Sequence, residues 1–334
     1  MASESGKKPG IDRGKGHDAK VMRVIDYLRI SITDRCNFRC AYCMPGKGVS
    51  YRRHDEILSY EEIIRFTRAT ARLGITRVRI TGGEPLVRRQ CPKLVAKLVA
   101  IPGIEDLSLT TNGALLTEHA EALRDAGLSR LNISIDSLNP DRFARITRGA
   151  TLAPVLAGLE MALELGFEPV KVNAVMIPGI EEELEEFVTL ARENPVHVRF
   201  IEFMPIGCHQ EDVRNFISRQ RILEGLSRLG DLKPVNSPVG GGPARYFRFD
   251  GARGTIGFIS SMSDHFCENC NRLRLTADGK LRNCLFSDDE VDIRPYINGD
   301  SMELANVIID SMNSKKFDRT GEKPLARTMS QIGG

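Results

Sequence analysis

From residue 28 onward, short runs rich in β-branched residues alternate with longer segments whose apolar positions recur every three or four residues. The short runs predict β-strands and the longer segments predict amphipathic helices. Several helical segments end at a glycine, as at Gly74, Gly127 and Gly166, where a helix commonly stops. The pattern predicts strands at 28–33, 77–81, 106–110, 130–135, 170–175 and 197–203, and helices near 60–73, 90–100, 117–126, 153–165 and 181–193.

This regular alternation predicts an α/β fold. Strands that are each followed by a helix form a parallel sheet with right-handed crossovers. No glycine-rich nucleotide fingerprint follows the first strand, so we expect a partial, six-fold βα TIM-type barrel, in which chemistry gathers at the carboxyl ends of the strands. After about residue 210 the rhythm gives way to a mixed pattern. We therefore predict a flexible basic tail (1–20), a barrel (21–210) and a C-terminal α+β extension (211–334).

Composition narrows the class of protein. The 334 residues carry a net charge of only +3, which gives no reason to expect a nucleic-acid partner. No apolar run is long enough to span a bilayer, and the first twenty residues lack the apolar core of a secretory signal. We therefore expect a cytoplasmic protein. In that reducing compartment, its eight cysteines are better suited to metal binding or catalysis than to disulfides.

Three cysteines lie within eight residues just after the first predicted strand. Cys36, Cys40 and Cys43 have the spacing C-x3-C-x2-C, one thiolate short of a closed four-cysteine site. Thiolates bind zinc or iron–sulfur clusters. Three of them leave either a fourth ligand from elsewhere or an open coordination position, and a four-iron cluster held in this way has one iron free to bind a small molecule. Zinc remains the structural alternative.

A second cysteine group lies in the C-terminal extension. Cys267, Cys270 and Cys284 form C-x2-C-x13-C, again with three ligands, whereas a zinc ribbon would normally offer a second C-x2-C pair. His265 is a possible fourth ligand, which we favour less than an open iron. The isolated cysteines, Cys91 and Cys208, are interpreted as buried or incidental.

Basic residues interrupt four of the predicted strands, although strands of a helix-covered parallel barrel usually read as continuous apolar runs. A buried cation requires an anionic partner. These positions therefore predict a cationic lumen that binds a polyphosphate, or else internal neutralisation by acids such as Asp136 and Glu202. The strand-borne cations are Arg29, Arg77, Arg79, Lys171 and Arg199, and Arg272 and Arg274 would add to the same positive field.

An ordered set of motifs resembles radical S-adenosylmethionine enzymes. The cysteine loop, with Tyr42 before its third cysteine, and "TGGEP" at the end of the second strand are similar to the cluster loop and the GGE motif of that superfamily. From about Leu28 to the last residue, the chain resembles its GTP 3′,8-cyclase family, which begins molybdenum-cofactor biosynthesis. The motifs are "DRCNFRCAYCMP", "RITGGEPLVR", "TTNG", "RFIEFMPIG", the C-x2-C-N-R-L-R stretch with Cys284, and the terminal Gly333–Gly334 pair.

The resemblance assigns residues to the two cofactors and the substrate. It implies a [4Fe–4S] cluster on Cys36, Cys40 and Cys43, and an auxiliary [4Fe–4S] cluster on Cys267, Cys270 and Cys284 whose open iron meets guanine. It implies that S-adenosylmethionine contacts Tyr42, Gly83, Ser134 and Met204. The GTP site would comprise Arg29, Arg79, Thr110, Lys171, Arg272, Leu273 (through its backbone) and Arg274, with Arg79, Lys171, Gly333 and Gly334 as catalytic residues.

The resemblance also implies a reaction and its partners. A 5′-deoxyadenosyl radical takes hydrogen from ribose C3′, and the sugar radical closes onto guanine C8 to give 3′,8-cyclo-7,8-dihydro-GTP. A low-potential electron donor supplies the cluster, and the product passes to the synthase of cyclic pyranopterin monophosphate. We expect a monomer or homodimer without nucleic-acid or membrane partners. The alternatives are a peptide-modifying radical maturase with an auxiliary cluster and a non-catalytic zinc-binding module.

Overall fold

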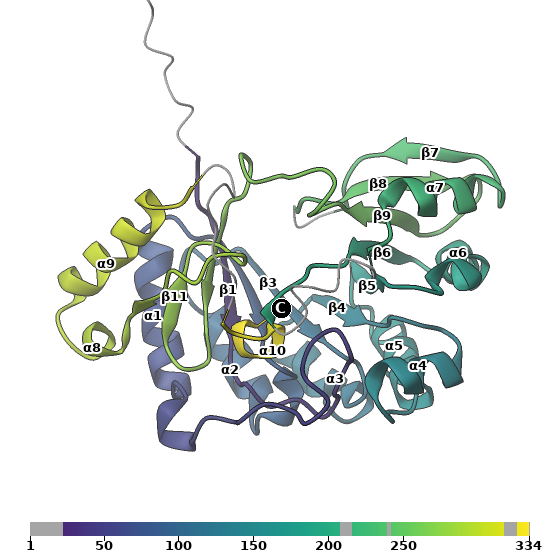
Figure 1. Ribbon diagram of the computed structural model, residues 1–334. Helices are drawn as coiled ribbons and strands as arrows, with labels where there is room; N and C mark the ends of the chain where they lie inside the picture. Colours follow the sequence, from purple (N-terminus) through teal and green to yellow (C-terminus); the bar gives the residue numbers. More distant parts are fainter. Residues whose placement is uncertain (1–22, 208–215, 239–241, 317–325, 334) are drawn as a thin grey trace, which may run out of the picture.

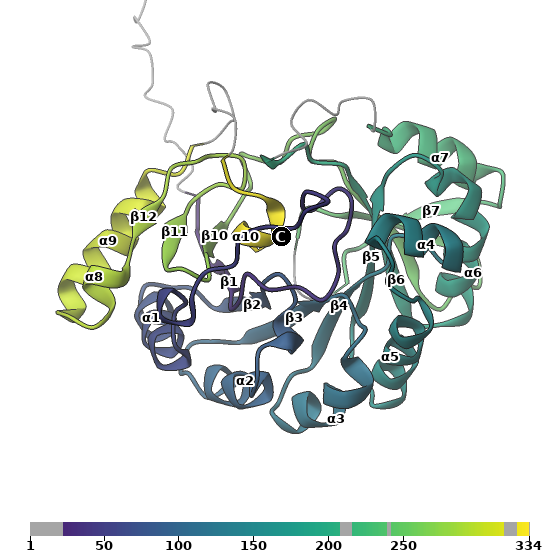
Figure 2. The same ribbon diagram turned by 60° about the horizontal axis from the view of Figure 1, so that its bottom comes forward.

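The computed structural model describes residues 23–207, 216–238, 242–316 and 326–333. Its strands form one curved sheet in the order β12-β11-β10-β1-β2-β3-β4-β5-β6-β9-β8-β7 (Figures 1 and 2). Strands β1 to β6 pair in parallel, which confirms the predicted α/β partial barrel. The first six strands are β1 (Tyr27–Ser31), β2 (Arg77–Thr81), β3 (Asp106–Thr111), β4 (Arg130–Ser134), β5 (Val170–Met176) and β6 (Val196–Glu202).

Helices cover the outer, convex face of this sheet (Figure 2). One barrel helix, α4, was not predicted; it begins after Asn139, whose side chain accepts hydrogen bonds from the next turn, with Pro140 at its first position. The barrel helices are α1 (Tyr60–Arg72), α2 (Cys91–Val99), α3 (Leu116–Asp125), α4 (Pro140–Thr147), α5 (Ala153–Glu164) and α6 (Leu184–Glu193), with short 3-10 helices η1 (His54–Glu56), η2 (Pro85–Val87) and η3 (Ile180–Glu183).

Each barrel strand has one apolar and one polar face. In β1, Leu28 and Ile30 are fully buried against the helices, whereas Tyr27 and Arg29 face the lumen. This alternation follows from the two-residue period of a strand. The basic residues therefore interrupt the apolar runs because the lumen is a polar cavity, while the helix-facing positions alone build the hydrophobic core.

The C-terminal extension divides into two parts that flank opposite edges of the barrel sheet (Figure 1). Strand β9 pairs in parallel with β6, and β10 pairs in parallel with β1, so both parts continue the same sheet. The boundary near residue 210 stays a prediction. The extension contains α7 (Arg219–Ser227), β7 (Leu232–Val235), β8 (Arg245–Phe249), β9 (Thr255–Ile259), β10 (Arg272–Leu275), β11 (Lys280–Arg282), β12 (Val291–Asp292), α8 (Arg294–Ile297), α9 (Ser301–Asn313) and α10 (Met329–Ile332).

The last of these helices, α10, lies inside the barrel mouth (Figure 2). The segment therefore returns from the edge of the sheet to the cavity. Within the described residues, every helix is too short or too polar to cross a membrane.

Candidate active site

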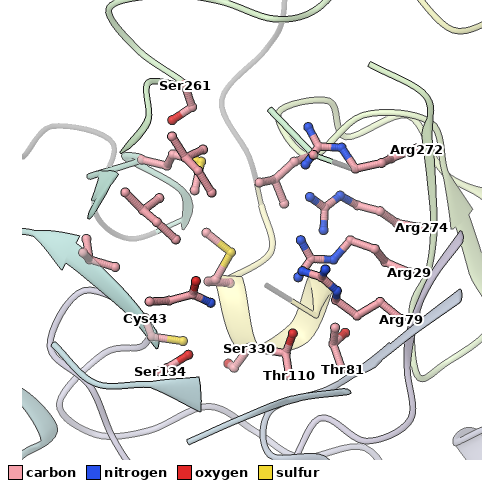
Figure 3. Close-up of a pocket in the computed structure, with 18 of the residues that line it drawn as sticks. Arg29, Cys43, Arg79, Thr81, Thr110, Ser134, Ser261, Arg272, Arg274 and Ser330 are labelled. Atoms are coloured by element: carbon pink, nitrogen blue, oxygen red, sulfur yellow. The ribbon is translucent and has the colours of Figure 1, made fainter. Parts of the chain in front are cut away.

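A cavity of about 300 Å³ occupies the barrel interior and its mouth. All six cysteines of the two groups line it, together with four arginines from β1, β2 and β10. Figure 3 shows Arg272, Arg274, Arg29 and Arg79 stacked along one wall, with Cys43 and Ser134 across the cavity. The fold thus brings together two cysteine groups that are more than two hundred residues apart in the sequence, around one positively charged space.

The first cysteine loop is held by main-chain hydrogen bonds. The Cys43 N–H donates to the Cys40 carbonyl at 2.9 Å, and the Phe38 N–H donates to the Cys36 sulfur at 3.3 Å. Burial raises the pKa of Cys36 to about 11 and that of Cys40 well above its ordinary value. Both thiols are therefore protonated at neutral pH in the metal-free protein, and binding of a metal would release these protons.

The GGE motif at the end of β2 is joined to the start of this loop. The Gly83 N–H donates to Thr33 O at 2.7 Å, and the Glu84 N–H donates to Arg35 O at 2.8 Å. A side chain at Gly83 would not fit, because its Cβ would lie 2.4 Å from Arg35 O. Burial raises the pKa of Glu84 to about 7, although its carboxylate accepts hydrogen bonds from Asn112 N, Leu86 N and Thr111 Oγ1.

Tyr42 is anchored by an acid at the end of β4. Its hydroxyl donates to Asp136 Oδ2 at 2.7 Å, and the other carboxylate oxygen accepts from Val175 N at 2.9 Å. Burial raises the pKa of Asp136, against these hydrogen bonds. Asp136 therefore connects the cysteine loop to β4 and β5, and we interpret it as a positioning residue.

Three arginines occupy neighbouring strands at the same level. In the register of the parallel pairs, Arg29 lies beside Arg79 on one side and beside Arg274 on the other. Like charges in adjacent strand positions repel each other. Burial, followed by the charges of Arg274 and Arg79, holds the pKa of Arg29 well below its ordinary value, and burial together with Arg272 lowers that of Arg274 to about 9. Such a group is stabilised by an anionic ligand.

The acids expected to neutralise the lumen have other partners. Asp136 binds Tyr42, and the buried Glu202 accepts main-chain hydrogen bonds from Met262 at 2.8 Å and Ser263 at 2.9 Å. Arg130, at the start of β4, pairs with Asp106 on the neighbouring strand. Internal neutralisation by Asp136 and Glu202 is therefore wrong, because both carboxylates serve to hold loops.

Glu202 also positions the segment that leads to the second cysteine group. In that group, the Phe286 N–H donates to the Cys284 sulfur at 3.4 Å. Burial acts to raise the pKa of Cys270, but the positive charges of Arg272 and Lys315 outweigh it and lower the pKa to about 6. The Cys270 thiolate is thus favoured at neutral pH. His265 directs Nδ1 to the main-chain carbonyl of Ser261, at 2.8 Å.

The C-terminal segment is fixed in the barrel mouth at both ends. Arg327 contacts both carboxylate oxygens of Asp278, at 3.1 and 3.0 Å, and Glu290 Oε2 at 2.8 Å. At the other end, Arg274 Nη1 donates to Gly333 O at 3.2 Å. Between them, Ile332 packs against Ile206 in a small apolar cluster of its own. Gly333 has φ of 84°, which favours glycine.

The structure brings together most of the residues that the sequence assigned to the site. Three do not line the cavity. Lys171 lies deeper on the lumen face of β5, the Leu273 side chain points into the core, and Gly333 lies behind the arginine wall, where its carbonyl accepts from Arg274. Gly334 and Cys208 lie outside the described residues. The assigned residues that line the cavity are Arg29, Tyr42, Gly83, Arg79, Thr110, Ser134, Met204, Arg272 and Arg274, with the six cysteines.

Several residues with a part in the site were missed by sequence reasoning. Asn112 donates toward the Cys36 sulfur at 3.9 Å and to Asn37 at 2.7 Å, and Arg327 anchors the tail. Asn112 belongs to the "TTNG" motif directly after a predicted strand, and this position could have identified it as a site residue. Arg327 gave none, because its acidic partners, Asp278 and Glu290, are adjacent to it only in the folded chain.

The cavity fits a polar ligand beside the cysteine groups. In the described part of the chain, neither the buried Thr110 hydroxyl nor the buried Tyr27 hydroxyl has a hydrogen-bond partner, and both residues line the cavity. Three partly buried thiols at one side and three at another offer two sets of soft sulfur donors, which suit iron–sulfur clusters. In the same residues, no three His, Cys, Asp or Glu side chains converge on a point where one metal ion would sit.

Comparison with known protein families agrees with this arrangement. Residues 30–191 match the model of the radical SAM superfamily, and residues 196–320 match the model named Molybdenum Cofactor Synthesis C. The fold is similar to that of the crystal structure of Streptococcus suis SuiB bound to S-adenosylmethionine, with a TM-score of 0.61 and 14% identity over 91% of this chain and 67% of that one. The partial barrel with its cysteine loop is thus that of a radical SAM protein.

The chain is much more similar in sequence to several GTP 3′,8-cyclases than to SuiB. The GTP 3′,8-cyclase of Pelotomaculum thermopropionicum is 48% identical over 93% of this chain and 98% of its own. That of Listeria monocytogenes (serotype 4b) is 45% identical over 94% of this chain and 98% of its own. The chain belongs to the GTP 3′,8-cyclase family.

Proposed function

We propose that this chain converts GTP into 3′,8-cyclo-7,8-dihydro-GTP, the first step of molybdenum-cofactor synthesis, in the cavity between its two cysteine groups. The observation that carries the proposal is the register of Arg29, Arg79 and Arg274 on adjacent strands. Three neighbouring guanidinium groups in a buried lumen repel one another unless an anion lies among them. A triphosphate supplies several oxygens in the geometry that arginine binds best.

The two cysteine groups would hold the cofactors. Cys36, Cys40 and Cys43 would carry the cluster that binds S-adenosylmethionine, and Cys267, Cys270 and Cys284 would carry an auxiliary cluster on the guanine side. When bound, the first cluster supplies the electron that cleaves the sulfonium of S-adenosylmethionine. The protein's own part is to orient the two substrates and to exclude water.

Individual residues divide these tasks. Tyr42, Gly83, Ser134 and Met204 surround the space beside the first loop, where S-adenosylmethionine would lie. The arginines of β1, β2 and β10 would hold the triphosphate on the opposite wall, with the Thr110 hydroxyl available as a further contact. The tail closes the mouth, and Gly333 brings its main chain next to Arg274 without a side chain.

Anaerobic incubation with GTP, S-adenosylmethionine and dithionite tests the reaction directly. We expect 5′-deoxyadenosine and a nucleotide of unchanged mass whose ribose and base have become linked, detected by mass spectrometry after derivatisation and by NMR. Iron and acid-labile sulfide should approach about eight atoms of each per chain, from two four-iron clusters. Two zinc ions per chain with no iron would contradict the proposal.

The proposed partners follow from the reaction. Cleavage of S-adenosylmethionine requires a low-potential electron donor, and the cyclised nucleotide requires a downstream synthase that forms cyclic pyranopterin monophosphate. The seven cysteines of the described residues are all free, which suits a reducing compartment such as the cytoplasm.

Replacing Arg79 with alanine is expected to weaken GTP binding about 10- to 100-fold and to leave S-adenosylmethionine binding nearly unchanged. Arg79 is buried, its Nε donates to Ser108, and its guanidinium lies 5.5 Å from the Tyr27 ring centre, on the arginine wall. Loss of charge-assisted hydrogen bonds gives an effect of this size. Isothermal titration of the anaerobic protein measures both affinities. The exposed Arg53→Ala serves as control, and equal losses for the two ligands would contradict the lumen assignment.

GTP binding at pH 8 is expected to take up close to one proton, and this uptake should disappear in Lys171→Met. Burial, followed by Arg199, Arg130 and Arg79, lowers the pKa of Lys171 to about 7, so the free protein holds it mostly neutral at pH 8. A bound triphosphate favours the charged form and raises the pKa again. Calorimetry in two buffers of different ionisation enthalpy measures the uptake. At pH 6, where Lys171 is already charged, the uptake should be small.

A further inference from the structure

A buried lysine lies against the second cysteine group. Lys315 follows α9 and is only 8% exposed, although lysine is almost never fully buried. Its ammonium donates to the main-chain carbonyl of Arg272 at 2.9 Å and to that of Asn283. Arg272 begins β10 and Asn283 follows β11, so the Lys315 side chain connects two separate segments of the chain.

The two carbonyls flank the cysteines of the group. Arg272 follows Cys270 by two residues, and Asn283 immediately precedes Cys284. Lys315 also lines the small opening behind the group, together with all three of its cysteines. Cys270 and Cys284 are the groups whose negative charge acts on the ammonium, and no carboxylate of the described residues lies within ion-pair distance of it.

We propose that Lys315 is a positioning residue of the second cysteine group, which fixes the two segments that carry Cys270 and Cys284 and offsets the negative charge of the thiolates. The proposal rests on the proposed auxiliary cluster. Two main-chain carbonyls supply the hydrogen bonds that a buried ammonium requires. The same contact fixes the strand start at Arg272, so it links the geometry of the cluster to the arginine wall of the cavity.

The charge of Lys315 has a measurable consequence. Reduction adds negative charge to a cluster, and a nearby ammonium favours the reduced form. Its removal should therefore shift the midpoint potential to more negative values. A three- to tenfold change in the reduction equilibrium corresponds to about 30–60 mV for one electron. Loss of the two hydrogen bonds should also loosen the ligand segments and speed the release of iron.

The second cluster can be examined alone in protein with Cys36→Ser, Cys40→Ser and Cys43→Ser. After anaerobic reconstitution, iron and sulfide content, the rate of iron loss to EDTA and an EPR-monitored redox titration are measured. In this background, Lys315→Met should lose iron at least tenfold faster than its parent and have the more negative potential. Lys315→Arg, which keeps the charge and donors, should give an intermediate rate of iron loss and a potential close to that of the parent.

Lys97→Met is the matched control, because it removes the same charge from an exposed position on α2, away from the openings that the cysteines line. It should retain both the rate and the potential of the parent. Thermal denaturation of the metal-free forms verifies folding. Should Lys315→Met be unfolded, Lys315→Gln, which keeps N–H donors but no charge, replaces it, with a smaller increase in the rate of iron loss and the same shift to a more negative potential.

Two results would overturn the proposal in different ways. If Lys315→Met matches Lys97→Met in rate and potential while the parent holds about four iron atoms per chain, Lys315 has no part in the group. If the parent itself binds no iron, the auxiliary cluster is wrong, and the role of Lys315 falls with it.

Discussion

Cys36→Ser is expected to abolish the release of 5′-deoxyadenosine from S-adenosylmethionine, to the background of protein without a first cluster. The Cys36 sulfur lines the cavity and accepts a hydrogen bond from Phe38 N, so a serine hydroxyl fits the same space. A hard oxygen is a poor ligand for iron in a cluster, where thiolate is preferred. Iron should fall by about four atoms per chain, because the second cysteine group is unaffected.

The control for this experiment is Cys91→Ala. Cys91 begins α2, is buried, and lies away from the cavity, so its loss should leave iron content and cleavage unchanged. Chromatographic assay of 5′-deoxyadenosine and iron analysis measure the two effects separately. Cleavage that persists in Cys36→Ser would show that the first loop does not hold the catalytic cluster.

Gly333→Val is expected to lower cyclised-nucleotide formation by about 100-fold or more. A Cβ at this position would lie 2.6 Å from the Ser31 Cβ and 2.8 Å from the Thr81 Oγ1, and neither strand can move away within the sheet. The φ of 84° adds strain for a β-branched residue. The tail must then leave its place beside Arg274, and small displacements of groups around a reacting substrate cost about two orders of magnitude.

Gly251→Val separates crowding from strain. Gly251 has a similar φ of 74°, but a Cβ there meets nothing within 4 Å. Gly251→Val should therefore lower the thermal midpoint slightly and leave product formation intact. Gly333→Val should lower product formation far more than it changes the thermal midpoint. Full product formation by Gly333→Val would mean that the tail does not need to occupy the barrel mouth during the reaction.

The contacts around the tail show how much of the site depends on distant residues. Arg327, Asp278 and Glu290 form an ion-pair group that fixes the start of α10, while Arg274 holds Gly333 at its end. Asp136 and Glu202 hold the two cysteine-bearing loops rather than neutralising the lumen. The role of each of these four acidic side chains is decided by a partner that lies far away in the sequence.

The sequence alone predicted the order of the six barrel strands, five of the six barrel helices and the two groups of closely spaced cysteines. Periodicity is a local property: the strand predicted at 77–81 has those bounds in the structure, and the other five differ from theirs by at most two residues at either end. Closely spaced thiols such as Cys36, Cys40 and Cys43 are also recognisable locally, because the chain itself limits how far apart they can lie. Such residues can be identified without knowing which residues lie next to them in the folded structure.

Only the tertiary structure decided which faces and loops meet. The pairing of β10 with β1 places Arg274 beside Arg29, and the return of α10 places Gly333 against Ser31 and Thr81. The division of the extension between both edges of the sheet likewise could not be predicted from residues 211–334. Such contacts join segments hundreds of residues apart, and they are selected by the packing of the whole chain, which no local pattern records.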